Sequence, residues 1–455
     1  MKILLYSAID PFSELETRYP ELGLAYLASA LLSAFPDCTV KIIYSKFKEE
    51  LNSFVPDFVG VKCVTQNFSI ACKASRICYD KKIPCVIGGV HISVLPESLL
   101  DNKSFFNVAV IGEGEQTIVE LIKHFQRYKH FNYNVNLLKI LGIAFVHDEK
   151  LYLTDKRERI KDLDTIPFPA RNLINVSKRT TMITSRGCPY NCCFCSSSQY
   201  WGGVRFFSSQ YVVSEIEYLV SQYKVNFISF IDDLFIADKK RIFEISDLLC
   251  GRKSVSGVRF TCQAHPSLID QDILEALKAM NVTLISSLGI ESGNDRILKK
   301  LKMGRTTVEN NYKAIRLIKK AGIHVNGSFI IGHPEETEDE MMDTYKFIKS
   351  SNLDMVEIYI LTPYPGTAIW DYYLSKKIVS PEMDFKLFNI LPKDIRNRPI
   401  YLETMSKEDF VRIYNKFRRL RFFYNSTRIW KNPMLGILPR YIFMKMVERV
   451  TTNTK

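Results

Sequence analysis

The chain has 455 residues, of which 46% are hydrophobic, so it can form the cores of two domains and is neither disordered nor of low complexity. Its formal net charge of +13 is best explained by a solvated basic surface, and we expect no nucleic-acid partner. The N-terminal MKILLYSAID lacks a cleavage site and no apolar run is long enough to span a membrane, which predicts a cytoplasmic protein. In a reducing cytosol, 11 cysteines indicate metal or redox chemistry rather than disulfides.

Short apolar strands alternate with helical patterns in the first third of the chain, which predicts a parallel, doubly wound sheet. Strands are expected at 3–6, 40–44, 58–64, 85–89 and 108–111, and helices at 22–35 and 68–79. Two strand ends carry glycines, in Gly88-Gly89-Val90-His91 and in Gly112-Glu113-Gly114-Glu115. Ligands of such sheets bind at the carboxyl ends of strands, where glycine lets the backbone approach them, although tight turns would use the same residues.

This segment resembles the cobalamin-binding domain that precedes some radical S-adenosylmethionine enzymes. The resemblance lies in residues 20–28, in residues 88–91 with Leu95-Pro96-Glu97 after them, and in residues 111–115. It implies that cobalamin contacts Gly88, Gly89, His91, Gly112, Glu113 and Gly114. The motif Asp-x-His-x-x-Gly is absent, because none of the 7 histidines has Asp two positions before it. In this family the cobalt then has no histidine below it, and a domain that has lost cobalamin is the alternative.

Residues 141–155 predict a β-hairpin around His147-Asp148-Glu149-Lys150. A charged run and Ile166-Pro167-Phe168-Pro169 follow, and the two prolines favour an extended connector. We therefore expect a first domain over 1–155 and a linker over 156–178.

A short strand at 181–184 leads into a cysteine-rich loop, Ser185-Arg186-Gly187-Cys188-Pro189-Tyr190-Asn191-Cys192-Cys193-Phe194-Cys195. Cys188, Cys192 and Cys195 supply three thiolates, whereas a four-iron cluster normally takes four, so one iron would stay open to the amine and carboxylate of S-adenosylmethionine. Zinc is the alternative, but it usually takes a fourth Cys or His close by, and none is near in sequence. Cys193 breaks the spacing and is interpreted as a packing residue.

The spacing C-x-x-x-C-x-x-C, with aromatic Phe194 before the last cysteine, resembles the signature of the radical S-adenosylmethionine superfamily. The resemblance implies a 4Fe-4S iron–sulfur cluster on the three cysteines. It also implies an external electron donor, whose electron reaches S-adenosylmethionine through the cluster and breaks a carbon–sulfur bond.

Strand–helix alternation continues after this loop and gives six units with the cluster strand included. The further strands are expected at 227–231, 258–262, 284–288, 325–331 and 355–361, and the helices at 212–223, 239–249, 271–280, 307–320 and 336–349. Six units are too few for a closed eight-fold barrel and suit the open partial barrel of the superfamily, which this region resembles. We place this domain at 179–375.

Two motifs of this region, Gly289-Ile290-Glu291-Ser292-Gly293 and Pro363-Tyr364-Pro365-Gly366-Thr367, resemble those of the branch with a cobalamin domain. By that resemblance Asp233, Gln263 and Glu291 contact the ribose or amino end of S-adenosylmethionine, with helix capping as the alternative.

The region 376–455 is predicted to be helical, with one helix at 407–425 that mixes basic and aromatic residues. Such a helix could lie on anionic lipid, but we expect it to pack its aromatic face on the barrel. Trp430 and a final basic helix follow.

The predicted function is that of a cobalamin-dependent radical methyltransferase, in which a 5′-deoxyadenosyl radical removes a hydrogen from an unactivated carbon and cobalamin supplies the methyl group. A radical cyclase, rearranging enzyme or oxidase of the same architecture is the alternative, and a non-catalytic cobalamin or cluster sensor is a third. The expected substrate is a small molecule or lipid, and no catalytic side chain is identified.

Overall fold

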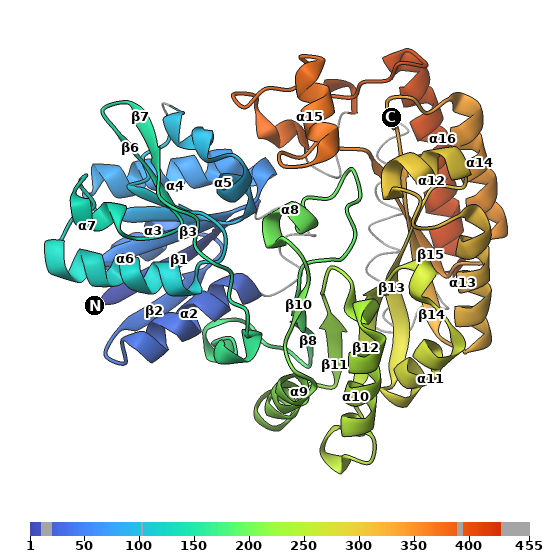
Figure 1. Cartoon of the computed structure of the whole chain (residues 1–455), viewed down its shortest axis with the longest axis horizontal. Coiled ribbons are helices and arrows are strands. Elements are labelled where there is room, and N and C mark those ends of the chain that lie inside the picture. Colours follow the sequence, from blue (N-terminus) through green and yellow to red (C-terminus); the bar gives the residue numbers. More distant parts are fainter. Residues whose placement is uncertain (11–20, 102, 389–394, 429–455) are drawn as a thin grey trace. The chain divides into compact units, whose positions relative to one another are not determined.

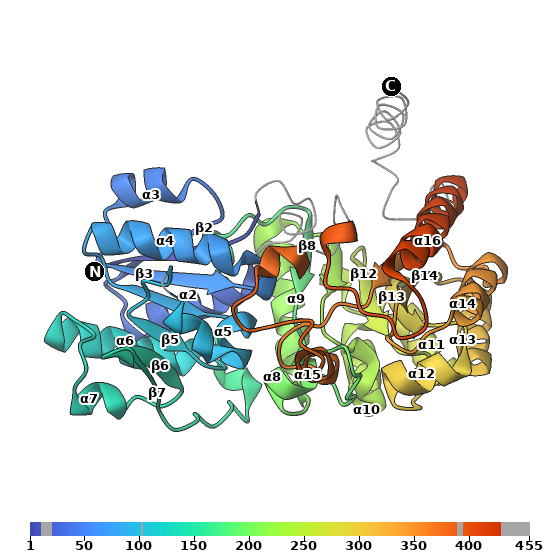
Figure 2. The same cartoon turned by 90° about the horizontal axis from the view of Figure 1, so that it is seen from above.

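The computed structural model describes residues 1–10, 21–101, 103–388 and 395–428 (Figures 1 and 2). The chain packs into two compact units, residues 1–228 with 362–399, and residues 229–361 with 400–455. This division follows packing contacts, and the expected boundaries near residues 155, 178 and 375 stay predictions. Within the described ranges, no helix is long and apolar enough to cross a membrane.

The first unit contains a seven-stranded sheet with the order β2-β1-β3-β4-β5-β6-β7. Its strands are β1 (Lys2–Ala8), β2 (Thr39–Ile43), β3 (Phe58–Cys63), β4 (Cys85–Gly88), β5 (Val108–Val110), β6 (Ile143–His147) and β7 (Lys150–Leu153). β1 to β5 pair in parallel, which confirms the predicted sheet. The predicted hairpin is β6 and β7, and it extends this sheet because β6 pairs antiparallel with β5.

Helices cover both faces of this sheet (Figure 2). They are α2 (Leu22–Ala34), α3 (Phe47–Phe54), α4 (Phe68–Asp80), α5 (Val90–Val94), α6 (Glu115–Tyr128) and α7 (Val135–Leu138). α2 packs on α6, and α3 packs on α4. The inner strands β3, β4 and β5 are buried on both faces, which is why they appear in the sequence as short continuous apolar runs.

The same unit includes the cysteine-rich loop and the elements around it. These are β8 (Arg179–Met182), β9 (Ser185–Arg186), α8 (Ser197–Trp201), β10 (Arg205–Phe206), α9 (Ser209–Tyr223) and α15 (Ala368–Ser375). A fully buried ion pair between Arg171 and Glu215, at 2.6 Å, joins the segment before β8 to α9. Arg171 also donates to the carbonyl of Thr181 on β8 at 3.0 Å. The segment that precedes β8 is therefore fastened to the strand that leads into the cysteines.

β8 also belongs to a six-stranded sheet with the order β15-β14-β13-β12-β11-β8. The further strands are β11 (Phe227–Phe230), β12 (Arg259–Ala264), β13 (Val282–Glu291), β14 (His324–Ile331) and β15 (Met355–Ile360). The helices between them are α10 (Lys239–Leu249), α11 (Gln271–Ala279), α12 (Asp295–Lys302), α13 (Val308–Lys320) and α14 (Glu338–Ser350). Consecutive strands are neighbours throughout, which is the order of the predicted partial barrel.

α16 (Lys407–Arg428) packs on β15 and α14, as expected for the basic, aromatic C-terminal helix. Its apolar stripe is buried, at Phe410, Ile413, Phe417, Leu420 and Tyr424. The Asn425 amide accepts from the Val356 backbone N–H and donates to the Val356 carbonyl, both at 2.9 Å, so the helix satisfies the edge of β15. Trp430 and the final basic helix lie outside the described residues.

Candidate functional site

The cysteine-rich loop begins at a glycine that no other residue could replace without moving the backbone. Gly187 has a φ of +92°, and a Cβ atom added there would lie 2.1 Å from the carbonyl oxygen of Gly203. The contact arises because β9 and β10 pair antiparallel with Arg186 opposite Arg205, so the residue after Arg186 lies beside the segment before Arg205. The turn before Cys188 is therefore fixed by close backbone packing.

Cys188, Cys192 and Cys195 are partly exposed on this loop, and the Cys195 N–H donates to the Cys192 carbonyl at 3.1 Å. All 11 cysteines lie among the described residues, and none forms a disulfide. Within the same ranges, no set of three or more His, Cys, Asp or Glu side chains is placed to hold a single metal ion. A 4Fe-4S cluster binds each thiolate to a different iron, and three accessible cysteines on one loop match the donor set it needs.

Cys193 is the fourth cysteine of the loop and, like the other three, is partly exposed. Burial raises the pKa of its thiol to about 12, so the thiol stays protonated at neutral pH. Its carbonyl accepts from the Ile369 N–H at 3.1 Å and ties the loop to α15. These contacts agree with a packing role for Cys193, because iron is bound by thiolates.

A buried ion network joins the loop after β5 to the strand before the cysteines. Arg186 Nη1 lies 2.5 Å from Glu113 Oε1, and Arg186 Nη2 lies 2.5 Å from Glu115 Oε1. Arg205 Nη1 lies 2.8 Å from Glu113 Oε2, which also accepts from the Ile160 N–H at 3.0 Å. The Arg186 guanidinium stacks on the ring of Trp201 at 5.5 Å. The predicted cobalamin loop and the predicted cluster loop are thus held together by charge.

The Glu113 carboxyl and the Arg186 guanidinium of this network stay charged although they are buried. Burial alone would raise the pKa of the Glu113 carboxyl, but hydrogen bonds from Arg205 and the charge of Arg186 outweigh it and lower the pKa. Burial alone would lower the pKa of the Arg186 guanidinium, but Glu115 and Glu113 raise it. Two arginines and two glutamates balance each other, which is the arrangement that makes buried charge tolerable.

The two predicted glycine motifs of the first sheet meet through one side chain. Ser93 on α5 donates to the Gly89 carbonyl and accepts from the Gly112 N–H, both at 2.9 Å. Gly89 has a φ of +109°, and a Cβ added there would lie 2.5 Å from the Cys63 carbonyl oxygen. Gly112 also has a positive φ, of +83°, but open space around it. The positive φ angles explain why glycine stands at both positions. Of the two, Gly112 is the one beside open space that a ligand could occupy.

His91 lies beneath this edge and is fully buried. Its ring stands 4.5 Å from Phe68 and 5.0 Å from Phe385, measured between centroids. Neither ring nitrogen has a hydrogen-bond partner in the described part of the chain, and burial lowers the pKa of the imidazole to about 3. The side chain is therefore neutral at physiological pH.

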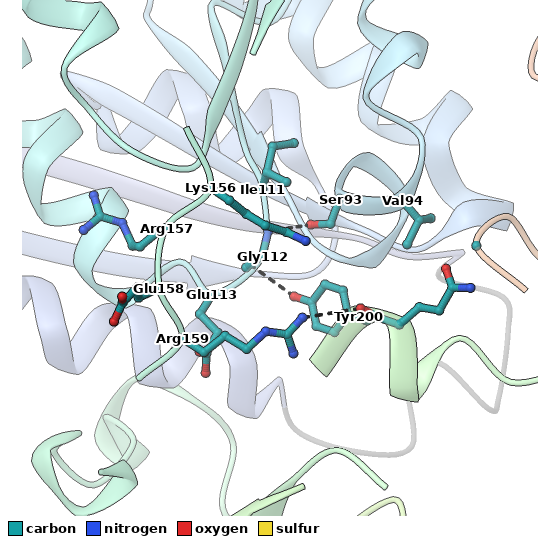
Figure 3. A pocket seen from close by; sticks show the side chains of 12 residues that line it. Ser93, Val94, Ile111, Gly112, Glu113, Lys156, Arg157, Glu158, Arg159 and Tyr200 are labelled. Atoms are coloured by element: carbon teal, nitrogen blue, oxygen red, sulfur yellow. Dashed lines mark hydrogen bonds between the residues drawn. The ribbon is translucent and has the colours of Figure 1, made fainter. Parts of the chain in front are cut away.

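A cavity of about 260 Å³ opens where these segments meet (Figure 3). Its wall includes Ser93 of α5, Gly112 after β5, Lys156 and Arg159 of the segment after β7, and Tyr200 of α8. The Tyr200 hydroxyl donates to the Gly112 carbonyl at 3.3 Å, and burial raises its pKa to about 12. The helix after Cys195 is thus bonded to the end of β5.

The second unit holds the three residues predicted to contact S-adenosylmethionine, each near a strand end. Glu291, the last residue of β13, is buried and has a φ of +66°, a strained conformation for a residue with a side chain. Lys302 Nζ lies 3.5 Å from Glu291 Oε1 and donates to the Gly289 carbonyl. Burial raises the pKa of the Glu291 carboxyl despite the opposing effect of Lys302.

Gln263 and Asp233 are more open than Glu291. Gln263, on β12, is partly exposed, and Asp233, which follows β11, is exposed. The neighbouring Asp232 is buried instead. Strained backbone together with a buried charge makes Glu291 the most constrained of the three.

Sequence reasoning missed the residues that connect these predicted positions. Arg186, Lys302 and the Arg171–Glu215 pair are buried charges, and Arg205 is partly buried, whereas a charged residue in a sequence is ordinarily assigned to the surface. Arg186 could have been identified, since it is the only charged residue between Thr180 and Cys195. Its partners are 71 and 73 residues away, and a single sequence does not pair them.

Comparison with known proteins agrees with these features. Residues 182–348 match the Radical SAM superfamily, and residues 12–122 match the B12 binding domain. An uncharacterised methyltransferase of Pyrococcus horikoshii, PH0819, is 31% identical over 409 residues, which cover 86% of each chain. The chain belongs to the family of radical S-adenosylmethionine enzymes with a cobalamin-binding domain. The predicted family and the prediction of an enzyme are both confirmed.

Other members of this family differ in the reaction that their names state. The anaerobic magnesium-protoporphyrin IX monomethyl ester cyclase of Cereibacter sphaeroides is 25% identical, over 94% of this chain and 72% of its own. The structure of the radical S-adenosylmethionine methyltransferase TsrM from Kitasatospora setae, with cobalamin and a 4Fe-4S cluster bound, has a TM-score of 0.67 at 16% identity. It covers 88% of this chain and 80% of its own, and it shows that the fold is shared.

Proposed function

We propose that this radical S-adenosylmethionine enzyme is a cobalamin-dependent methyltransferase that acts on an unactivated carbon of a small molecule. The observation that carries the proposal is the Arg186 network, which fastens the loop of a B12 binding domain to the radical-generating loop. An enzyme that uses both cofactors in one turnover needs them held in a fixed relation. The similarity to the methyltransferase PH0819 over most of both chains supports the same reaction class.

Cys188, Cys192 and Cys195 would hold the 4Fe-4S cluster, with Phe194 beside the last ligand. When bound, the cluster and S-adenosylmethionine supply one-electron cleavage of a carbon–sulfur bond, and cobalamin supplies a methyl group. The role of this chain is to fix the loop through Gly187, to keep Cys193 protonated and packed, and to admit an external reductant.

The cobalamin contacts would come from Gly88, Gly89, His91, Gly112, Glu113 and Gly114. Both carboxylate oxygens of Glu113 are occupied by arginines and the Ile160 N–H, so this residue would act by positioning the backbone of its own loop. His91 would contribute a neutral, buried ring, in keeping with its lowered pKa. S-adenosylmethionine would be contacted by Glu291, Gln263 and Asp233, of which Glu291 is held by Lys302.

These assignments imply four regions: a cobalamin-binding domain at 1–155, a linker at 156–178, the partial barrel at 179–375 and a helical part at 376–455. The alternative reaction, radical cyclisation or oxidation, is supported by similarity to the cyclase of C. sphaeroides, but at lower identity than the similarity to PH0819.

The experiment is anaerobic reconstitution with iron, sulfide, hydroxocobalamin, S-adenosylmethionine and a chemical reductant, followed by mass analysis of small-molecule extracts incubated with the enzyme. We expect a product one CH₂ group heavier than its precursor, formed by wild type and Cys193→Ala and absent with Cys188→Ala. A product that has only lost hydrogen, or has the precursor's mass, would favour the cyclase or rearrangement alternative.

A further inference from the structure

The cavity beside Gly112 carries more positive charge than its own carboxylates can neutralise. Figure 3 shows Lys156 and Arg159 extending towards Tyr200 from the linker segment. Of the two acidic residues in the wall, Glu113 is engaged by Arg186 and Arg205, and the side chain of Glu158 is 86% exposed to solvent. Lys156 and Arg159 form no ion pair with any residue in the described ranges.

The Arg159 guanidinium is held in place although its hydrogen bonding is incomplete. Its Nη2 donates weakly to the Gln199 carbonyl at 3.4 Å, while its Nη1 is buried without a partner among the described residues. It lies against Gly202, where an added Cβ would be 2.6 Å from Arg159 Cζ. The absence of a side chain at Gly202 thus makes room for a cation at the cavity wall.

A second arginine near the cavity also has a side-chain donor without a hydrogen-bond partner among the described residues. Arg205 Nη2 is also buried without a partner in the part of the chain that is described, although Arg205 Nη1 is bound to Glu113. Burial and the charge of Arg205 lower the pKa of the Arg159 guanidinium, and the opposing charge of Glu113 does not reverse that shift. Two like charges with unused buried donors are unfavourable unless an anion lies between them.

The size and the position of the cavity indicate which anion would bind in it. At about 260 Å³ it is smaller than the usual pocket for a whole organic ligand, so it would hold one group of a larger molecule. It opens at Ser93 and Gly112, which follow β4 and β5 of the sheet within the matched B12 binding domain. Arginine and lysine are the side chains that bind phosphate most often, by charge-assisted hydrogen bonds.

We infer that Lys156 and Arg159 bind the phosphodiester of the nucleotide tail of cobalamin, so that the linker contributes a cofactor-binding subsite that neither glycine motif includes. The inference rests on the proposed cobalamin-dependent function. It assigns to the linker segment a role in cofactor selection, because a corrinoid without this phosphate leaves the two cations unneutralised.

The test compares two corrinoids, hydroxocobalamin and cobinamide, which lacks the phosphodiester-linked nucleotide. Their dissociation constants are measured by absorbance titration for wild type, Arg159→Gln, Lys156→Gln and the double variant. Lys161→Gln is the matched control, since it removes an exposed charge from the same segment. Far-ultraviolet circular dichroism and the thermal midpoint establish that each variant is folded.

Arg159→Gln should weaken cobalamin binding about tenfold and the double variant further, while cobinamide affinity stays within about twofold of wild type. Lys161→Gln should change neither. Equal weakening of both corrinoids, or unchanged cobalamin affinity in the double variant, would overturn the inference and leave the cobalamin assignment standing. A wild-type protein that binds neither corrinoid would contradict the proposed function and the inference with it.

Discussion

Replacement of Glu113 by Gln tests the network that joins the two cofactor loops. The variant keeps the shape of the side chain but removes a charge whose oxygens receive Arg186, Arg205 and the Ile160 N–H, in a carboxylate that is only 7% exposed. Glutamine retains one acceptor oxygen and places an NH₂ group against an arginine. Because each hydrogen bond to a charged group contributes about 1.5–3 kcal/mol and a broken buried pair costs about 3–5 kcal/mol, we expect a loss of about 2–3 kcal/mol in unfolding free energy.

The loss is obtained from the shift of the urea midpoint multiplied by the m-value. Glu158→Gln is the matched control, because Glu158 is 86% exposed and its pair with Lys161 is solvent-screened, so its effect should stay below about 0.5 kcal/mol. The pKa of folded Glu113 lies below its ordinary 4.5, so the difference between wild type and Glu113→Gln should be complete above about pH 4.5. It should then shrink as the pH falls through the folded-state pKa. A Glu113→Gln effect no larger than that of Glu158→Gln would refute the reasoning.

Three further outcomes follow from the same geometry. Anaerobically purified wild type and Cys193→Ala should each carry about four irons per chain, whereas Cys188→Ala, Cys192→Ala and Cys195→Ala should lose them, and an iron-free Cys193→Ala would contradict the ligand assignment. Gly187→Ala should lose iron, because its Cβ would lie 2.1 Å from the Gly203 carbonyl oxygen. Gly203→Ala is the control and should retain iron, because the space around Gly203 is open. Equal iron content in the two variants would contradict the argument from backbone contact. Because burial lowers the pKa of folded His91 to about 3, protonation of the unfolded chain should make wild type lose stability as the pH falls from 6.5 towards 3. His91→Phe should not show this loss of stability between pH 6.5 and 3. Urea midpoints that change in parallel with pH in the two proteins would contradict the expectation.

Much of the fold was predictable because its signals are local. The strands of the first sheet and of the partial barrel are short apolar runs between helical patterns, and the cysteine spacing lies within eight residues, 188–195, of one loop. The antiparallel addition of β6 and β7 to the sheet depends on Ala144 meeting Ala109, a pairing across 35 residues with no local sign. The same holds for Arg186 with Glu113, since only the fold brings them together.

Residues of the candidate site could be proposed from the sequence where a local motif marks them, but not where only the packing of the folded chain does. The three cysteines were identified from their spacing and the glycine motifs from their places at strand ends, and the family resemblance assigned them to a cluster and to cobalamin. Arg159 was not, because its significance depends on Gly202 and Arg205, which only the folded chain places beside it. Lys302, buried against Glu291, occupies a helix position that its charge alone would assign to the surface.

The central claim, that one turnover combines radical formation with methyl transfer, is tested most directly by counting the two products of S-adenosylmethionine. With a methylatable substrate, the account predicts equal amounts of 5′-deoxyadenosine and S-adenosylhomocysteine, one of each per methylated product. Cys188→Ala should form no 5′-deoxyadenosine, since the cluster loop has lost a ligand. Turnover that yields 5′-deoxyadenosine without matching S-adenosylhomocysteine would contradict the account.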